Sequence, residues 1–377
     1  MATVNGTCEQ RFEGLKDTLA ALIDTGSDLG VSLAVVARGR PVVDLWSGWM
    51  DESKSRPWER DTITNVWSTT KTMTALCALM LIDRGLIHED DPVAKHWPEF
   101  AAGGKELVTI GHLMSHTSGV SGWERPVRVE DIYDWEASTS RLAAQQPWWE
   151  PGTASGYHAI DYGHLIGEVV RRVTGKKLGR FLADEVAGPL GADFQIGTPE
   201  SDWPRIAQIV APPPLPAQEG VDFNTPMMKT FGGPPIDANF ANTPGWRLAD
   251  IGGANGHGNA RSVARIQSVI SNGGEVDGVR LMSQQTIDRI FREYADGTDL
   301  VIGVPVRFGL GYALGCAETP YLPSEGICFW GGWGGSLIVN DLPRKTTVCF
   351  MMNKMAPGVI GSASSKAILE AVYRILD

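Results

Sequence analysis

Ser68 and Lys71 are the first residues whose types and spacing could do chemistry. They open and close the segment Ser-Thr-Thr-Lys at 68–71. Residues three apart lie on one face of a helix with Cβ atoms about 5–6 Å apart, so the lysine amine can reach the serine hydroxyl. A serine needs such a base to become a nucleophile. The alternative is a helix-capping serine with a solvated lysine, because this spacing arises about once by chance in a chain of this length.

Tyr157 is the second candidate. It follows a Pro-Gly turn at 151–152 and precedes a helix expected from about residue 160, so its side chain can project into a cleft. A free phenol titrates near pH 10. A nearby ammonium would lower its pKa and make the phenolate a usable base. The alternative is a tyrosine packed at a helix start with its hydroxyl satisfied.

The third candidate is the segment Trp-Gly-Gly-Trp-Gly-Gly-Ser at 330–336. Glycine in a strand often marks a place where a ligand approaches the backbone, and a strand edge beside the nucleophile could supply an N–H group to an oxyanion. The alternative is a glycine-rich turn between two strands. A further segment, Leu-Met-Ser-His-Thr-Ser-Gly at 113–119, is interpreted as structural: a helix that ends in a hydrogen-bonded turn.

The elements that must position these residues follow from hydrophobic patterning. Apolar residues at helical spacing predict a helix within 8–25, and a long apolar helix is expected from Ser68 to about Arg84-Gly85. Two apolar runs within 30–49 predict a hairpin. Further helices are expected at 163–186, 260–274, 283–294 and 364–376, strands at 308–316, 326–332, 336–341 and 346–353, and a proline-rich loop at 211–220.

Strands therefore occur toward both ends of the chain, with a mostly helical block between them. The economical fold is α/β of the α+β type, in which one antiparallel sheet is built from both ends and flanked by helices. The predicted domains are a discontinuous α/β unit formed by 1–85 and 241–377 and a mostly helical insertion over 86–240. A cleft between the two units is the default ligand site.

Composition excludes several classes of function. The 377 residues carry a formal net charge of −11, which disfavours nucleic acid as a partner. The five cysteines lack any metal-ligand spacing, so neither a disulfide framework nor a metal or other cofactor is expected, and Cys77 and Cys349 read as buried hydrophobes. No signal sequence or membrane span is recognised, so a cytoplasmic location is expected; the oligomeric state is left open.

The candidate segments occur together, in this order, and give the chain a family resemblance. It resembles the serine β-lactamase/penicillin-binding-protein superfamily, in its class C-like branch, and most of all the family VIII carboxylesterases. The resemblance spans nearly the whole chain through WSTTKTMTALCALMLIDRG, LMSHTSG, PGTASGYHAIDYGHLIGEVVRRVTGK and GHGNARSVARI. It implies that superfamily's fold, with Ser68 as nucleophile, Lys71 and Tyr157 as the activating pair, and the backbone N–H groups of Ser68 and Trp333 as the oxyanion hole.

Two departures from the β-lactamase pattern narrow the expected substrate. Residues 157–159 are Tyr-His-Ala, where class C β-lactamases have Tyr-Ala-Asn. Residues 330–332 are Trp-Gly-Gly, where those enzymes have Lys-Thr-Gly. An indole in place of an ammonium favours a neutral, apolar substrate. The expected substrate-binding residues are Trp330, Gly331, Gly332, Trp333, Trp123 and His158. Core packing is the favoured alternative for Trp67 and Trp123, whereas Trp330 and Trp333 are expected in the pocket.

The expected activity is hydrolysis of small carboxylic esters with short to medium acyl chains, through an acyl-enzyme on Ser68, with weak β-lactam turnover as a side activity. Whether Lys71 or Tyr157 is the first base stays open. The rival activities are an amide hydrolase (a β-lactamase or a D-amino-acid peptidase) and an acyltransferase. A non-catalytic binding module on the same fold is the rival from another class, and the intact Ser68, Lys71 and Tyr157 argue against it.

Overall fold

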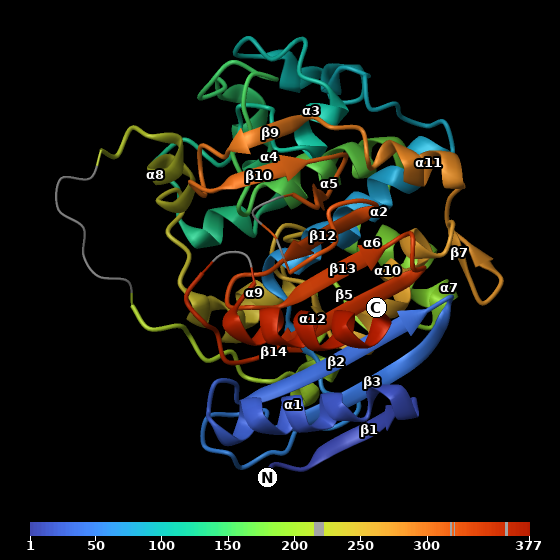
Figure 1. Ribbon diagram of the computed structural model, residues 1–377. Helices are drawn as coiled ribbons and strands as arrows, with labels where there is room; N and C mark the ends of the chain where they lie inside the picture. The colour runs from blue at the N-terminus through green and yellow to red at the C-terminus, as the bar shows by residue number, and fades with distance from the viewer. Residues whose placement is uncertain (215–221, 317–318, 320, 359–360) are drawn as a thin grey trace.

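The computed structural model describes residues 1–214, 222–316, 319, 321–358 and 361–377. Within this part of the chain, nine strands form one antiparallel sheet that takes strands from both chain ends (Figure 1). In their order across the sheet, the strands are β1 (Val4–Cys8), β3 (Arg40–Gly48), β2 (Gly30–Ala37), β14 (Thr346–Met352), β13 (Leu337–Asp341), β12 (Ile327–Gly331), β11 (Ala313–Leu314), β10 (Pro305–Phe308) and β9 (Ala295–Thr298).

The two ends of the chain meet where β2 pairs with β14. Val35 lies opposite Val348 in this register, and nearly every residue of both strands is buried. Strands covered on both faces read as continuous apolar runs, as these two do. The predicted sheet, the hairpin β2–β3 and the strands predicted at 326–332, 336–341 and 346–353 are confirmed. The strand predicted at 308–316 is wrong in extent, because only Phe308 and Ala313–Leu314 of this segment lie in strands.

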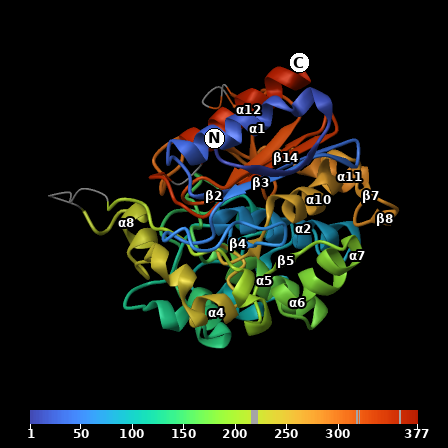
Figure 2. The same ribbon diagram turned by 90° about the horizontal axis from the view of Figure 1, so that it is seen from below.

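Helices cover both faces of the sheet. Helices α1 (Gly14–Asp24) and α12 (Ala363–Leu376) pack together on one face, and α10 (Ala260–Ser271) packs on the other against β2, β13 and β14 (Figure 2). The apolar residues of α1 fall on one stripe, which buries Leu15 and Leu19. These helices confirm three of the predicted ones.

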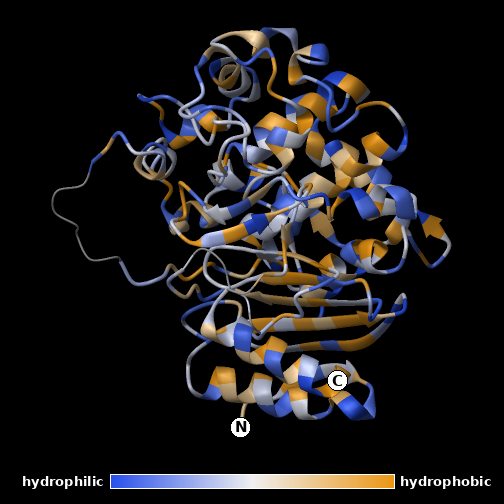
Figure 3. Cartoon of the chain, turned by 45° about the horizontal axis from the view of Figure 1, so that its top comes forward, coloured by the Kyte–Doolittle hydropathy of each residue, from blue (hydrophilic) through white to orange (hydrophobic). Residues whose placement is uncertain are grey.

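Helix α2 (Thr70–Asp83) forms the centre of the molecule. Every residue from Thr70 to Ile82 is buried, as expected of a helix that is apolar on all sides. It ends at Asp83 with Arg84 as the capping residue, and Gly85 follows with a φ of 67°, a conformation that glycine adopts without strain. Figure 3 shows hydrophobic residues concentrated along the strands and inner helices, with hydrophilic residues prominent in the outer loops and turns.

The block between residues 86 and 240 consists mainly of short helices. The helix predicted over 163–186 is interrupted at Gly175, which has a φ of 75° and ends the first helix, α5.

The remaining helices of the described residues, inside this block and outside it, are α3 (Ile110–Met114), α4 (Trp135–Ala144), α5 (Tyr162–Thr174), α6 (Leu178–Leu182), α7 (Gly188–Leu190), α8 (Pro226–Phe231), α9 (Pro244–Leu248) and α11 (Gln284–Arg289). The short helical turns are η1 (Gln10–Phe12), η2 (Trp67–Thr69), η3 (Val93–Lys95), η4 (Pro98–Ala101), η5 (Val129–Ile132), η6 (Ala183–Ala187), η7 (Glu200–Arg205) and η8 (Ala238–Asn242).

Small strands tie this block to the rest of the chain. β6 (His257–Gly258) lies between β4 (Thr64–Asn65) and β5 (Phe194–Gln195) in a three-stranded sheet. A separate two-stranded sheet pairs β7 (Glu275–Val276) with β8 (Val279–Arg280). Since β5 belongs to the predicted insertion and β4 and β6 do not, the boundaries at 85/86 and 240/241 stay a prediction. Strands β9 and β10 were not anticipated, because the four residues of β9 are largely exposed and show no apolar alternation.

Other sequence expectations have mixed outcomes. Residues 211–214 have no regular structure, and 215–220 of the predicted loop lie outside the described residues. Cys77 and Cys349 are buried and unpaired, as predicted. In the part of the chain that the structure describes, no helix is long and apolar enough to cross a bilayer.

Candidate active site

Ser68 lies in the short helical turn that leads into α2. The preceding residue, Trp67, has a φ of 48°, a left-handed conformation that is rare for a bulky side chain. Neighbouring hydroxyls hold this bend: Ser336 donates to the Val66 carbonyl oxygen at 2.8 Å, and Thr70 donates to the Trp67 carbonyl oxygen at 2.5 Å. Strained backbone that its surroundings hold in place is typical of functional sites. Here the bend places Ser68 at the wall of a cavity.

Lys71 is buried one turn after Ser68. Its Nζ is hydrogen-bonded to the Ser68 Oγ at 3.1 Å and donates to the carbonyl oxygens of Ala159 and Gly253 at 2.7 Å each. Burial lowers the pKa of Lys71 well below its ordinary value, because desolvation penalises the charged amine. The sequence prediction that Lys71 reaches the Ser68 hydroxyl is therefore met in the geometry.

Tyr157 is buried beside this pair. Its hydroxyl accepts a hydrogen bond from the Trp330 indole N–H at 3.2 Å, and its backbone N–H donates to the Asp299 carboxylate at 3.0 Å. The Lys71 Nζ lies 4.6 Å from the centre of the tyrosine ring. Burial raises the pKa of Tyr157, an effect that contacts with Ser68 and Trp330 only partly offset. The phenol therefore keeps its proton at neutral pH, and the lowered pKa expected from a nearby ammonium is not found.

Two buried histidines lie next to Tyr157. Helix α3 ends at Met114, and His116 follows in the turn predicted from the sequence. The His116 ring lies 5.0 Å from that of Tyr157, and its Nδ1 is 3.2 Å from the Nδ1 of His158. Burial lowers the pKa of His158 to about 3. His158 was expected to contact substrate, but it lies in this neutral pair instead.

An apolar cavity of about 300 Å³ opens beside Ser68. The Trp67 and Trp333 rings meet edge to face at 5.0 Å in its wall. The described residues that line the cavity are Trp67, Ser68, Tyr157, Ala159, Ile160, Thr230, Phe231, Pro234, Ile236, Ala254 and Trp333. Trp333 thus lines the cavity, as expected from the sequence. Trp67 lines it too, although core packing was the favoured interpretation for that residue.

The other expected substrate-binding residues do not line this cavity. The indole of Trp123 is buried and donates to the Ser138 carbonyl oxygen at 3.1 Å, so it belongs to the core. Trp330 contacts the tyrosine hydroxyl from the side of the sheet. A side chain at Gly332 would collide with the Val66 carbonyl oxygen and the Ser336 hydroxyl, so glycine there lets the turn approach the nucleophile. Gly331 ends β12 and is likewise buried.

The expected oxyanion hole consists of the backbone N–H groups of Ser68 and Trp333. Gly332 and Gly334 donate their N–H groups to the carbonyl oxygens of Ser336 and Gly358. Among the described residues, the N–H of Trp333 between them has no acceptor. A free N–H group at the cavity wall is the geometry that an oxyanion requires, and the assignment stays a prediction.

Several residues of the site could not be recognised from their spacing in the sequence. The apolar cavity wall takes Ile160, Phe231 and Ile236 from distant segments. Asp299 accepts hydrogen bonds from the N–H groups of Tyr157, Val301 and Ile302, and so anchors the tyrosine to the turn between β9 and β10. Asp161 is buried near Lys71; its place four residues after Tyr157 was the one available clue.

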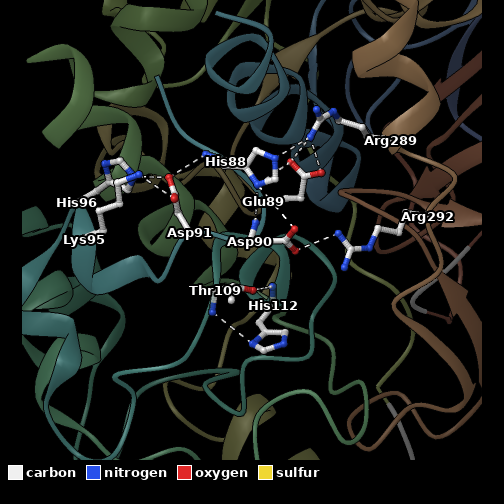
Figure 4. Close-up of polar contacts among 10 residues, drawn as sticks. All are labelled: His88, Glu89, Asp90, Asp91, Lys95, His96, Thr109, His112, Arg289 and Arg292. Carbon is white, nitrogen blue, oxygen red and sulfur yellow. Dashed lines mark hydrogen bonds and ion pairs between the residues drawn. The ribbon is translucent and has the colours of Figure 1, made fainter. Parts of the chain in front are cut away.

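One group of side chains has the composition of a metal site. His88, Glu89 and Asp90 place their ligand-type atoms within 4.8 Å of one another, the one such group found among the described residues (Figure 4). Arg289 donates to both carboxylate oxygens of Glu89 at 2.6 Å, and Arg292 donates to Asp90 at 3.0 Å. The carboxylates are already paired with guanidinium groups, so we interpret the group as an ion-pair cluster.

Comparison with known proteins places this site in a family. The family model described as beta-lactamase matches residues 15–373. The esterase/beta-lactamase LipL of Mycobacterium tuberculosis is 35% identical over 364 residues, which cover 93% of this chain and 83% of that protein. Esterase EstB of Burkholderia gladioli is 28% identical over an alignment of 400 positions that covers 94% of this chain and 95% of that protein.

The structural comparison agrees with the sequence comparison. The crystal structure of a family VIII carboxylesterase superposes with a TM-score of 0.93 at 40% identity, covering 99% of this chain and 100% of that one. A penicillin-binding protein homologue from Caulobacter crescentus superposes with a TM-score of 0.91 at 33% identity, covering 99% and 100%. The chain belongs to the beta-lactamase family, and the expected resemblance to family VIII carboxylesterases is confirmed.

Proposed function

We propose that this protein is a serine carboxylesterase that hydrolyses uncharged esters of short to medium acyl chains through an acyl-enzyme on Ser68. The observation that carries the proposal is the 3.1 Å contact between the Ser68 hydroxyl and the buried Lys71 amine at the wall of an apolar cavity. The esterases among its relatives support it as well.

The first step is attack of the Ser68 Oγ on the ester carbonyl carbon. Lys71 takes the serine proton, because burial lowers the pKa of its amine while it raises that of Tyr157. The N–H groups of Ser68 and Trp333 stabilise the negative oxygen, and one such donor contributes about 3–4 kcal/mol to lowering the barrier.

The second half of the cycle returns the enzyme to its resting state. Tyr157 gives its proton to the leaving alkoxide, and the phenolate then accepts a proton from the attacking water. The Trp330 indole N–H, 3.2 Å from the phenol oxygen, stabilises the phenolate in between. Water attacks the acyl carbon, the acid leaves and Ser68 recovers its proton.

The cavity lining favours uncharged acyl groups. None of the described residues that line it is Lys, Arg, Asp or Glu, so a substrate carboxylate would lose its hydration without gaining a partner. Its volume of about 300 Å³ lies at the lower end for ligand pockets, which suits short and medium chains.

Weak β-lactam hydrolysis is the second candidate activity, and the relative named esterase/beta-lactamase is compatible with it. The same Ser68–Lys71 pair would form that acyl-enzyme. D-amino-acid peptidase and acyltransferase activities stay alternatives, as does a cytoplasmic location, which cell fractionation would test.

The test compares wild type and Ser68→Ala on p-nitrophenyl esters from acetate to dodecanoate, beside nitrocefin and a D-alanyl peptide. We expect the wild type to prefer the shorter esters and Ser68→Ala to lose activity by at least about 10⁴-fold. Ester hydrolysis that persists in Ser68→Ala would overturn the mechanism. A wild type that cleaves nitrocefin or the peptide faster than any ester would overturn the substrate assignment.

A further inference from the structure

Phe231, the last residue of α8, lies where the cavity beside Ser68 meets the solvent. Its side chain lines the cavity and is also 41% exposed, whereas the other described lining residues are buried or half-buried. Ser68 and Tyr157 are buried at the reaction centre. The cavity therefore runs from the nucleophile in the interior to the ring of Phe231 at the surface.

The end of α8 that carries Phe231 is fastened to a neighbouring loop. The Arg125 guanidinium donates to the Met228 carbonyl oxygen at 2.7 Å. The hydroxyl of Thr230, the residue before Phe231, is buried and lies 2.7 Å from the Ser121 hydroxyl. Because these contacts fix the backbone of α8, the Phe231 ring is held at the cavity mouth although much of it faces water.

Exposed apolar side chains continue the cavity lining outward from Phe231. Met227 lies one turn earlier on α8 and is exposed, as are Leu300 and Val304 in the turn between β9 and β10. A side chain at Gly303 in that turn would come within 3.3 Å of the terminal carbon of Met227, so the two segments lie close together (Figure 1). Exposed apolar side chains that gather beside a cavity are typical of a surface that binds an apolar ligand.

We propose that Phe231 is a specificity-determining residue that covers the distal carbons of an acyl chain whose carbonyl carbon is bound at Ser68. The role rests on the proposed esterase function, because it concerns the substrate of the same site. The ring shields the chain from water, and each methylene that leaves water contributes about fourfold to binding. A chain too short to reach the cavity mouth gains nothing from the ring. Phe231 therefore favours a medium acyl chain relative to acetate.

The test is the acyl-chain profile of Phe231→Ala with p-nitrophenyl acetate, butyrate, hexanoate and octanoate. Loss of cover over about two methylenes should lower the ratio of kcat/KM for hexanoate to that for acetate by about tenfold. The fall should come through KM rather than kcat, because the contact holds the ground state and the transition state alike. Phe231→Leu keeps an apolar cover and should hold the ratio within about threefold of wild type.

Two results would overturn the proposal. One is an unchanged ratio in folded Phe231→Ala, which would mean that the ring does not touch the chain. The other is a gain in kcat/KM for octanoate relative to acetate, which would mean that the ring blocks long chains instead of covering medium ones. Thermal unfolding of each variant shows that it is folded.

Phe223 provides the matched control. It is the same residue type near the same helix and is 59% exposed, but it lines a separate cavity with Trp123 and Trp148. Its ring lies 6.0 Å from the guanidinium carbon of Arg125. Phe223→Ala should keep the hexanoate-to-acetate ratio within about twofold of wild type. A fall equal to that in Phe231→Ala would contradict a specific role for the cavity mouth.

A second series of esters tests which part of the substrate lies under the ring. Acetate esters of alcohols from ethanol to octanol keep the acyl group short and lengthen the other side. Their relative rates in Phe231→Ala should parallel those of the wild type. If instead only this series changes, the alcohol chain occupies the cavity and the acyl assignment is wrong.

Covalent labelling separates this inference from the esterase assignment. Alkyl fluorophosphonates with ethyl and octyl chains label a nucleophilic serine without ester turnover. The octyl-to-ethyl ratio of labelling rates at Ser68 should fall by about tenfold in Phe231→Ala. If the wild type cleaves no ester yet this ratio falls, the esterase assignment fails and the role of Phe231 stands. If esters are cleaved and neither ratio changes, the role of Phe231 fails and the esterase assignment stands.

Discussion

Two buried lysines, Lys71 and Lys105, occupy similar environments in different parts of the molecule. Each amine donates to backbone carbonyl oxygens and lies over an aromatic ring, Tyr157 at 4.6 Å for Lys71 and Phe100 at 5.0 Å for Lys105. Burial lowers the pKa of both, that of Lys105 to about 8. Burial by itself therefore does not mark the catalytic lysine.

The difference lies in the third acceptor. Lys105 donates to three carbonyl oxygens, those of Ala102, Ala143 and Gln145, and so fastens two loops together. Lys71 donates to two carbonyl oxygens and to the Ser68 hydroxyl. A carbonyl group has no proton to give, whereas a hydroxyl has one. The same arrangement thus holds loops together at Lys105, whereas at Lys71 it suits the proposed role of a base.

The sharpest way to break this comparison is to replace each lysine by methionine. Lys71→Met should lower kcat/KM for a short ester by about 10²- to 10⁴-fold, the range for loss of a general base. Lys105→Met should keep activity within about twofold but lower the free energy of unfolding by about 2–4 kcal/mol, because three buried carbonyl groups lose their donor. Kinetics and urea unfolding of both variants measure the two effects. Equal loss of activity in folded Lys105→Met would contradict the division of roles.

A smaller effect is expected at the tyrosine beneath Lys71. Tyr157→Phe removes the proton donor for the leaving group and should lower kcat/KM by about 10²-fold. Tyr162→Phe is the matched control, since its hydroxyl is also buried and makes a long 3.4 Å bond to the Met114 carbonyl oxygen. It should change activity by no more than about twofold. Similar losses in the two variants would show that the phenol acts through packing alone.

The smallest effect concerns the contribution of Lys105 to the free energy of unfolding as the pH changes. Its folded pKa of about 8 lies below the value of about 10.4 for an unfolded lysine. Between these values the unfolded chain binds more protons than the folded one, so the free energy of unfolding rises with pH, by at most about 1.4 kcal/mol per unit. Below pH 8 the contribution is level. Urea unfolding of the wild type and of Lys105→Met across pH 7–10.5 measures this slope as the difference between their free energies of unfolding. A difference that does not change with pH would contradict a folded pKa of about 8 for Lys105.

Much of the reaction centre could be predicted from the sequence because local geometry dictates it. A serine and a lysine three apart at a helix start must be neighbours, and a tyrosine after a turn can reach them. The sheet followed from apolar runs at both ends of the chain. Strand β9 could not be predicted because a short, exposed edge strand has no apolar pattern to detect. Strand β10 has only four residues, and two buried positions are too short a pattern to identify a strand.

The cavity could not be predicted in the same way. Its wall combines Ile160, Phe231 and Ile236, and an apolar residue in a cavity has the same sequence character as one in the core. Both indoles of the glycine-rich segment were expected in the pocket, but only Trp333 is among the described residues that line the cavity. β12 ends at Gly331, and the turn that follows sends Trp333 toward the cavity while Trp330 faces Tyr157.

The pairing of β2 with β14 has a consequence for the newborn chain. Val35 and Val348 are partners in the sheet although about 310 residues separate them. A contact so distant in sequence forms late and slowly, because a long loop must close first. Ser68 emerges from the ribosome early, but the hydroxyl of Ser336 that holds its bend emerges among the last strands. The enzyme therefore becomes competent only when synthesis is nearly complete, and a partial chain should carry its nucleophile without the means to use it.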